Sequence, residues 1–197
     1  MRRQRALSIS LLLGLGLLGM PTASAQGTTT YDFEACEQGW TVESNSGTSA
    51  PFSAWHHGPD GSTSSMAFHA GPPYVGDADE SVISPIHVWK GGKVTVGFNL
   101  RYQFEPAETS LGADNVSIEW SNNGEIWRIV ETFAPPAGSV PVSEGFPTYA
   151  PHEVSFNAPK GKLQIRFHLV SDALVEGIGA SVDNVTLPVK PPKDAAC

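Results

Sequence analysis

Two segments carry the side chains best suited to bind a polar ligand, because planar amide and guanidinium groups alternate with apolar residues in both. The polar residues are Asn99, Arg101 and Gln103 in the first segment and Gln164, Arg166 and His168 in the second. Such groups form paired hydrogen bonds with carboxylates or with neighbouring hydroxyl groups. If both segments are strands of one sheet, the six side chains line one polar face, which we predict binds a ligand. An ordinary solvated sheet face is the alternative.

Aromatic residues outside these segments indicate what that ligand is. Trp55, Tyr74 and Trp89 fall in predicted loops and offer a stacking surface for a sugar ring. Trp120 and Trp127 are instead predicted to pack in the core or between strands, as is Trp40. These features favour a glycan as the ligand, with an exported protein as the alternative partner.

Catalytic motifs are missing from the sequence. There is no HExxH helix, no CxxC pair and no GxSxG elbow, and the adjacent His56 and His57 would point to opposite faces of a strand. Glycoside hydrolysis needs two carboxylates about 5 to 10 Å apart across a cleft. The candidate carboxylates are Glu105, Glu108, Asp114 and Glu119. Because their spacing selects no pair, we predict no catalytic residues and rank a hydrolase third.

The elements that must position these side chains are short alternating strands. Apolar residues occupy every second position of 94–104 and 163–169, which predicts strands with one buried face. Further strands are predicted at 31–35, 39–43, 66–69, 81–88, 116–120, 126–133, 153–156 and 178–187. Turn formers such as Asn123-Gly124, Gly91-Gly92 and Pro159-Lys160-Gly161 separate them. The fold class is therefore predicted as all-β, an antiparallel β-sandwich of jelly-roll type.

Composition agrees with a folded, mildly acidic globular domain. The chain has 197 residues, of which 40% are hydrophobic and 16% charged, and its net charge is -8. A disordered chain would be richer in charge, and a nucleic-acid binder would be basic. The composition therefore excludes both classes.

The first 25 residues have the pattern of a secretory signal peptide. Arginines 2, 3 and 5 precede an apolar run from Leu7 to Met20, and Ala23-Ser24-Ala25 suits cleavage before Gln26. Removing three arginines and no acidic residue takes the net charge from -8 to -11. We predict a signal peptide at 1–25, a domain at 26–187 and a proline-rich tail at 188–197. The protein is then secreted, has no membrane span, and by its net charge avoids nucleic acid and anionic membranes.

The two cysteines leave two outcomes open. In an oxidising compartment, Cys36 and Cys197 can form a disulfide that closes a loop over nearly the whole domain. Otherwise Cys36 is buried, and the free Cys197 can link two chains. The second outcome would make the protein a structural or self-associating module.

In chain order, these features resemble a known family. The matching pieces are Asp32-Phe33-Glu34, Gly39-Trp40 and residues 81–86, 94–105, 114–120, 123–127, 163–172 and 177–187. Their order and spacing are similar to the jelly-roll domains attached to immune inhibitor A-type metallopeptidases and, more distantly, to MAM domains. The resemblance covers nearly all of the chain after the predicted leader. It implies an accessory binding or adhesion domain with no chemistry of its own.

The resemblance also implies a structural Ca²⁺ site that joins the first strand to the last. The implied ligands are Glu34 and Asp183, with Asp32 or Asp79 in addition. Asp183 shares the parity of Val185 and Leu187, so in a regular strand its carboxylate points among apolar side chains and needs a partner. An arginine partner, or a bulge that turns Asp183 to solvent, are the alternatives.

Overall fold

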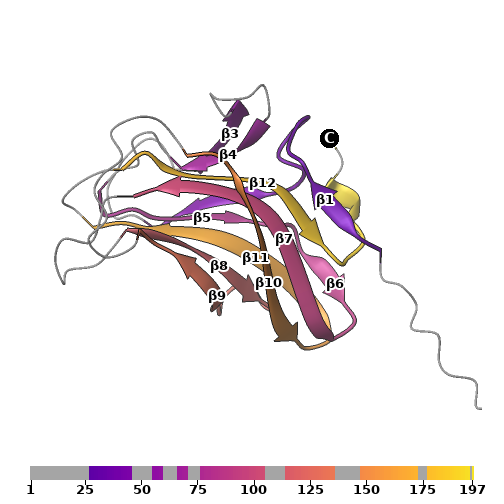
Figure 1. Ribbon diagram of the computed structural model, residues 1–197. Coiled ribbons are helices and arrows are strands. Elements are labelled where there is room, and N and C mark those ends of the chain that lie inside the picture. The colour runs from indigo at the N-terminus through magenta and orange to yellow at the C-terminus, as the bar shows by residue number, and fades with distance from the viewer. Residues whose placement is uncertain are drawn as a thin grey trace, which may run out of the picture.

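Two antiparallel sheets pack face to face in a jelly-roll sandwich, which confirms the all-β prediction (Figure 1). The computed structural model describes residues 27–45, 55–59, 66–70, 76–104, 114–135, 147–172, 177–195 and 197. Apart from one short 3-10 helix (Lys193–Ala195), all regular elements of these residues are strands. No helix among them is long and apolar enough to cross a membrane.

The first sheet is built around the longest strand, and we call it the β7 sheet. In spatial order its strands are β10 (Ala150–Ala158), β7 (Gly92–Gln103), β12 (Gly179–Leu187), β4 (Met66–Ala70) and β3 (Trp55–Pro59), and β1 (Thr29–Tyr31) pairs with β12. Valines, phenylalanine and leucine alternate along β7 at 94, 96, 98 and 100, and all four side chains are buried. The predicted strand at 94–104 is thereby confirmed as the centre of this sheet.

The second sheet, which we call the β11 sheet, faces the first. In spatial order its strands are β2 (Thr41–Ser44), β5 (Asp79–Ile83), β11 (Gly161–Val170), β8 (Asn115–Ser121) and β9 (Arg128–Phe133), and β6 (His87–Trp89) pairs with β11. Alternate residues of β11 from Leu163 to Leu169 are completely buried. Because alternate residues point to opposite faces, the residues between them lie on the outer face of the sheet.

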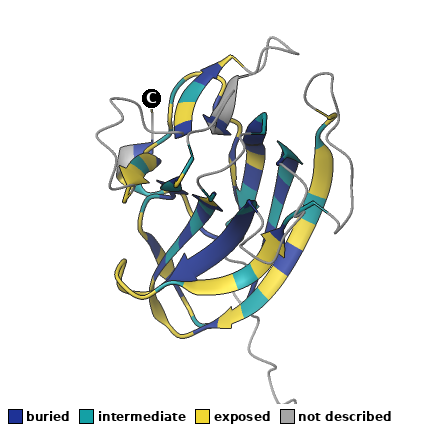
Figure 2. Cartoon of the chain, turned by 90° about the vertical axis from the view of Figure 1, so that its left-hand side faces the viewer, coloured by how far each residue is buried: buried dark blue, intermediate teal, exposed yellow. Residues whose placement is uncertain are grey.

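The core is the layer between the sheets. Phe98 of β7 meets Phe167 of β11 edge to face, with ring centroids 5.1 Å apart. Trp120 of β8 stacks on Phe156 of β10 at 5.3 Å. Figure 2 shows how buried residues alternate with more exposed ones along the long strands. This alternation fixes which side chains remain available on the two outer faces.

Cys36 and Cys197 form a disulfide, so the first of the two outcomes left open by the sequence is the one observed. The cysteines are 161 residues apart in the sequence, and their Cα atoms lie 5.8 Å apart. The C-terminal segment packs against the domain, since Val189 is completely buried and Ala195 nearly so. The disulfide therefore joins the segment after β1 to the end of a packed chain.

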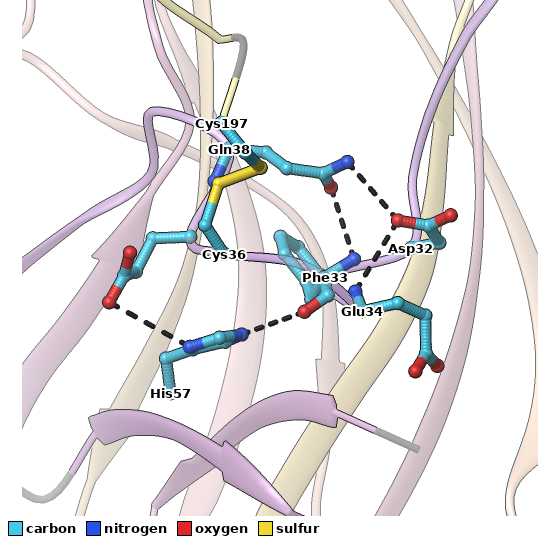
Figure 3. The surroundings of a disulfide bond; sticks show 8 residues. Asp32, Phe33, Glu34, Cys36, Gln38, His57 and Cys197 are labelled. Atoms are coloured by element: carbon cyan, nitrogen blue, oxygen red, sulfur yellow. Dashed lines mark hydrogen bonds and ion pairs between the residues drawn. A yellow bond between two sulfur atoms is a disulfide. The ribbon is translucent and has the colours of Figure 1, made fainter.

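Polar contacts around the disulfide hold the segment 32–38 in place (Figure 3). The Gln38 side chain accepts a hydrogen bond from the Phe33 amide at 3.0 Å and donates one to Asp32 at 3.1 Å. His57 of β3 donates to the Phe33 carbonyl at 2.8 Å and lies 3.7 Å from Glu37. Phe33 has a φ of 56°, which is unfavourable for a bulky residue, and these bonds to both its backbone groups hold it there.

Candidate ligand-binding face

The six predicted ligand-binding residues lie on two different sheets. Asn99, Arg101 and Gln103 belong to β7, and Gln164, Arg166 and His168 belong to β11. Within each strand the three residues share the outer face, as alternation predicts, but the two outer faces point away from each other across the core. The condition for one shared polar face is therefore not met, and each half is considered by itself.

On the β7 half, the central guanidinium is closed off. Arg101 is only 2% exposed, and the Tyr149 ring lies 4.8 Å from its guanidinium carbon. Ser181 of β12, its cross-strand neighbour, is completely buried and contacts His69 at 2.8 Å. A guanidinium that is buried beneath a ring contributes to packing and is not accessible to a ligand. Arg101 thus has the predicted outward parity, but it is buried and does not stand on an open ligand-binding face.

On the β11 half, a buried ion pair organises the outer face. Arg166 donates two hydrogen bonds to one oxygen of Glu119 on β8, from Nε at 2.9 Å and from Nη2 at 2.8 Å. The side chains of Arg166 and Glu119 are 12% and 5% exposed. The other Glu119 oxygen accepts a hydrogen bond from Ser117 at 2.8 Å. The guanidinium plane is therefore fixed by its partner rather than free to follow a ligand.

His168 extends this pair into a chain of alternating charges. Its Nδ1 lies 3.0 Å from Glu119, and its Nε2 lies 2.8 Å from Asp79 on β5. A carboxylate only accepts hydrogen bonds, so both contacts are satisfied when the ring carries two protons. Asp79, His168, Glu119 and Arg166 then alternate in sign and cancel in total charge.

The pKa values of the two central groups agree with this charge pattern. Burial alone would raise the pKa of Glu119, but hydrogen bonds from His168, Ser117 and Arg166 outweigh it and lower that pKa to about 2. Burial would likewise lower the pKa of His168, but its hydrogen bonds to Glu119 and Asp79 outweigh burial and raise it. Both shifts favour the ionised forms, as expected for an ion-paired network.

Trp127 covers this network from the solvent side. It lies in the connection between β8 and β9, and its ring stands 4.5 Å from the Arg166 guanidinium carbon. The connection is shaped by Asn123, whose Oδ1 accepts hydrogen bonds from the amides of Glu125 and Ile126 at 3.0 and 2.9 Å. Trp127 was predicted to pack in the core or between strands, and it lies half-buried on the outer face, where it packs against Arg166 of β11. An outward arginine such as Arg166 in an alternating strand indicates that an aromatic ring could stack on it. The sequence does not show, however, which tryptophan does so.

Gln164 lies beside the same connection. Its amide nitrogen donates to the Ser84 carbonyl at 3.1 Å, which fixes the orientation of the side chain. A methyl group placed on Gly124 would lie 3.3 Å from the Gln164 Oε1, so the connection passes close to that oxygen. Gly124 has a φ of 80°, a conformation that glycine adopts without strain. The Gln164 acceptor on β11 and the Trp127 ring in the β8–β9 connection are thus both on the outer face.

Exposed aliphatic residues gather on the β11 sheet as well. Within the described ranges, the large hydrophobic residues that are exposed are Ile86, Val88, Ile126, Ile129 and Val170. All five belong to β6, β9, β11 or the segments next to these strands. Apolar side chains concentrated on one face of a soluble domain mark an interaction surface. This outer face therefore has the strongest claim to ligand binding.

The histidine network has the residue types of a catalytic triad but not the geometry. Ser117 is the cross-strand neighbour of His168, and Asp79 contacts the same ring. The Ser117 hydroxyl, however, donates to Glu119, and both ring nitrogens face carboxylates. No ring nitrogen is left to accept a proton from the serine. The network serves as a structural element of the binding face.

The carboxylates considered for hydrolysis are either engaged or outside the described residues. Asp114 is completely buried and accepts a hydrogen bond from the Asp172 amide at 2.9 Å. Glu119 is held by Arg166, His168 and Ser117, as described above. Glu105 and Glu108 lie outside the described residues. No facing pair of carboxylates across a cleft arises from the two that are described.

The four predicted calcium ligands are distributed over three places. Asp79 lies on β5 and contacts His168, Asp183 lies on β12, and Asp32 and Glu34 follow β1. In the described ranges no group of three or more histidine, cysteine or acidic side chains is gathered in a way that would hold a metal ion. The calcium site therefore stays a prediction, and Asp79 has a partner in another network.

The inward orientation expected for Asp183 is wrong because β12 is not regular. The register with β7 shifts between Asp183 and Thr186, and Asn184 has a φ of 52°. Before the bulge Val182 faces the core opposite Leu100, so Asp183 opposite Asn99 lies on the outer face. Asp183 is nevertheless buried, and it accepts hydrogen bonds from the amide and side chain of Asn184 at 2.6 and 2.9 Å. After the bulge Val185 returns to the core.

The aromatic residues predicted to offer a sugar surface do not do so. Trp55 and Trp89 are 1% and 3% exposed and belong to the core. The Trp55 ring nitrogen donates to the Glu80 carbonyl at 3.3 Å. Tyr74 lies outside the described residues. Of the aromatic residues considered, Trp127 is the one that lies half-buried on the outer face of the β11 sheet.

Comparisons with known proteins identify the fold. No family model and no curated protein sequence matches the chain. Among solved structures, it is similar to the K1 cleaved adhesin domain of Lys-gingipain from Porphyromonas gingivalis W83, with 16% identity, a TM-score of 0.56, and coverage of 83% of this chain and 98% of that domain. The chain is also similar to the K3 cleaved adhesin domain of the same protein, with 15% identity, a TM-score of 0.56, and coverage of 81% of this chain and 97% of that domain.

A third similar structure is the C-terminal CBM6 of a marine laminarinase from Zobellia galactanivorans. It has 12% identity, a TM-score of 0.47, and coverage of 82% of this chain and 98% of the other. At these identities the similarity is one of fold. The jelly-roll part of the predicted family resemblance is confirmed, and the specific relation to immune inhibitor A-type or MAM domains stays a prediction.

Proposed function

We propose that the chain is a non-catalytic binding module that holds a neutral glycan on the outer face of the β11 sheet. The observation that carries this proposal is the Trp127 ring, fixed at 4.5 Å over the Arg166 guanidinium next to the oriented Gln164 side chain. A flat aromatic surface beside a fixed hydrogen-bond acceptor suits a sugar ring, which has an apolar face and polar edges. The similar gingipain domains are named as adhesin domains, and a binding role places this chain in the same broad class.

The charge pattern favours a neutral ligand over an acidic one. The two cations nearest Trp127 on this face, Arg166 and His168, are already paired with Glu119 and Asp79. A paired buried cation offers little attraction to an incoming carboxylate or sulfate. We infer recognition by stacking and by hydroxyl hydrogen bonds rather than by ion pairing.

An exported protein is the second candidate ligand. Ile129 is 67% exposed on β9, next to Trp127, and Ile126 is exposed in the same connection. Aliphatic side chains contribute area to a protein interface but add little to a sugar site. The disulfide supports an exported location for either partner, because disulfides persist in oxidising compartments. The predicted signal peptide at 1–25 lies outside the described residues.

Removing the Trp127 ring is expected to weaken glycan retention at least tenfold. The Trp127→Ala variant loses the stacking surface, whose contribution to a bound sugar is on the order of 1.5 kcal/mol or more. The measurement is mobility in native gels that contain neutral soluble polysaccharides, namely β-glucan, xylan and galactan, each at several concentrations.

Two control variants make this result specific. Trp127→Phe keeps a flat ring and is expected to retain most of the retention, whereas Val88→Ala removes an exposed side chain from β6 and is expected to change nothing. If Trp127→Ala migrates like the wild-type protein in every gel that retards the wild type, the assignment of the site is wrong. If none of the polysaccharides retards the wild type, the glycan proposal gives way to the protein partner.

We also propose, from the family resemblance, that a Ca²⁺ ion bound by Glu34 and Asp183 stabilises the domain. Glu34 and Asp183 are on adjacent strands or their ends, since β1 pairs with β12 through Tyr31 and Val185. Chelation with EDTA is then expected to lower the midpoint of thermal unfolding by several degrees, because a ligand of the native state alone adds to its stability. If calorimetry gives the same midpoint of thermal unfolding with and without added Ca²⁺, the proposal that Ca²⁺ stabilises the domain is wrong.

A further inference from the structure

Two short turns close one end of the sandwich side by side. The β6–β7 turn runs from the β11 sheet to the β7 sheet, and the β10–β11 turn returns from the β7 sheet to the β11 sheet. Trp89 pairs with Gly161, and Gly92 pairs with Ala158, so the two turns lie directly opposite each other. A methyl group on Gly91 would lie 3.2 Å from the backbone nitrogen of Lys160. Both turns are seen at the lower right of Figure 1.

These turns concentrate the cationic side chains of an acidic protein. Lys90 lies in the first turn and Lys93 next to it at the start of β7, Lys160 lies in the second turn and Lys162 next to it at the start of β11, and all four are exposed. We call these four residues the lysine end. The whole sequence has only 12 lysines and arginines, and it has no acidic residue at positions 81–104 or 154–171. Glu125 lies in the β8–β9 connection beside Gln164, which is two residues along β11 from Lys162.

Four acidic residues lie at the other end of the same strands or just beyond it. Asp79 pairs with Val170 at the far end of β11, and the Asp77 amide donates to the Asp172 carbonyl there. Asp114 accepts from the Asp172 amide at the same place. β11 has 10 residues, so at about 3.3 Å per residue the two ends are roughly 30 Å apart. The lysines are therefore at the opposite pole of the sheet from these four acidic residues.

Exposed aliphatic side chains stand among the lysines. Val88 is 82% exposed, and it lies opposite Lys162 in the pairing of β6 with β11. Ile86, two residues earlier, is 49% exposed. An apolar side chain exposed to this extent, beside four unneutralised charges, is not explained by packing within the domain. It fits a partner that is anionic at its surface and apolar beneath.

We propose that the lysine end, with Val88 and Ile86, docks the protein on the head groups of an anionic lipid bilayer. The lysines would contact lipid phosphates, and the two aliphatic side chains would enter the boundary between head groups and acyl chains. A soluble polyanion would use the lysines but not Val88 or Ile86. The lipid surface is therefore the partner that the whole set of residues favours.

The negative net charge does not oppose this orientation. At physiological ionic strength the Debye length is about 8 Å, so charges roughly 30 Å away contribute little to the potential at the membrane. The expectation from net charge that the protein avoids anionic membranes holds only if charge is spread evenly over the surface. Here the pole that meets the bilayer is positive.

Sedimentation with lipid vesicles tests the proposal. The purified protein is expected to sediment with vesicles of phosphatidylcholine containing 30% phosphatidylglycerol at 0.1 M NaCl, and to be released by 0.5 M NaCl. The Lys160→Gln/Lys162→Gln variant is expected to lose more than tenfold in partition coefficient, because each lysine near an anionic surface contributes a factor of several. The Thr132→Glu/Thr148→Glu variant changes the net charge equally at exposed positions outside the two turns, and it is expected to bind as the wild type does.

Two further measurements distinguish a lipid bilayer from other anionic partners. Val88→Ser is expected to weaken vesicle binding while leaving binding to heparin, a soluble polyanion, unchanged. Equal binding to vesicles of phosphatidylcholine alone, or equal loss in the lysine variant and the control variant, would overturn the proposal. Binding to heparin without binding to anionic vesicles would overturn the lipid as the partner. None of these measurements depends on the glycan site at Trp127.

Discussion

Replacing Arg166 with alanine is expected to lower the free energy of unfolding by about 3 to 5 kcal/mol. The change leaves Glu119, which is 5% exposed, without the two hydrogen bonds that its Oε2 receives. A buried carboxylate that loses its charged partner must either stay ionised at high cost or take up a proton. Urea unfolding followed by circular dichroism measures the loss.

A double variant separates the buried charge from the packing. In Glu119→Leu/Arg166→Met both charges are absent and the volume is roughly kept, so most of the lost stability is expected to return. His168 then faces Asp79 alone. A loss below 1 kcal/mol in Arg166→Ala would mean that Glu119 is solvated, contrary to the structure. If the single and the double variant lose the same free energy of unfolding, the loss comes from packing and not from the buried charge.

Removing the disulfide is expected to cost about 5 kcal/mol of stability. The bond closes a loop with a sequence separation of 161 residues, and in the chain-entropy model a loop of this length restricts the unfolded chain by about that amount. The Cys36→Ser/Cys197→Ser variant is compared with the wild-type protein by urea unfolding. A loss below 2 kcal/mol would mean that the segment 32–38 and the C-terminal segment are held together by other contacts.

Reduction of the wild-type protein provides the matched control for that experiment. The reduced protein and the serine variant are expected to unfold at the same urea concentration, because both lack only the covalent link. On a gel without reductant the wild type is expected to migrate as a monomer, since both cysteines are used within one chain. A dimer band that disappears on reduction would contradict the intrachain pairing.

The sequence predicts the fold well because alternation is a local signal. Val94 to Leu100 and Leu163 to Leu169 alternate without interruption, and each strand has the predicted face buried. Alternation, however, shows only which residues share a face of one strand. It does not tell which strands share a sheet, because that depends on pairings between distant segments such as β7 with β12 and β11 with β5. Arg101 and Arg166 were therefore assigned to one surface although they lie on two.

The position of a residue in the alternating pattern also does not determine how deeply its side chain is buried. Arg101 and Arg166 have the parity of outward residues, yet both are largely buried, because Tyr149 and Trp127 lie over them. Nothing in the local sequence of β7 or β11 indicates these covering rings, which come from outside the two strands. In the structure the two arginines pack beneath aromatic rings, whereas Gln164 keeps its place as a proposed ligand contact.

The bulge in β12 shows a third limit of the pattern. The residues from Val182 to Leu187 continue an alternating pattern as if the strand were regular, which placed Asp183 in the core. Asn184 takes a positive φ, and one extra residue shifts the register. Asparagine adopts this conformation more easily than most residues, so the position was a weak signal for a bulge. The pattern alone could not choose between a bulge and a metal partner.

The measurement that tests the central claim most directly is a titration of the isotopically labelled protein with neutral oligosaccharides, followed by NMR. Oligosaccharides of β-glucan, xylan and galactan are added in turn, and the indole N–H signal of Trp127 and the side-chain amide signals of Gln164 are observed. For at least one series we expect these signals to shift most, together with backbone amides of the β8–β9 connection. Shifts confined to Asn99 and Gln103 on β7, or no shift with any series, would contradict a glycan site on the outer face of the β11 sheet.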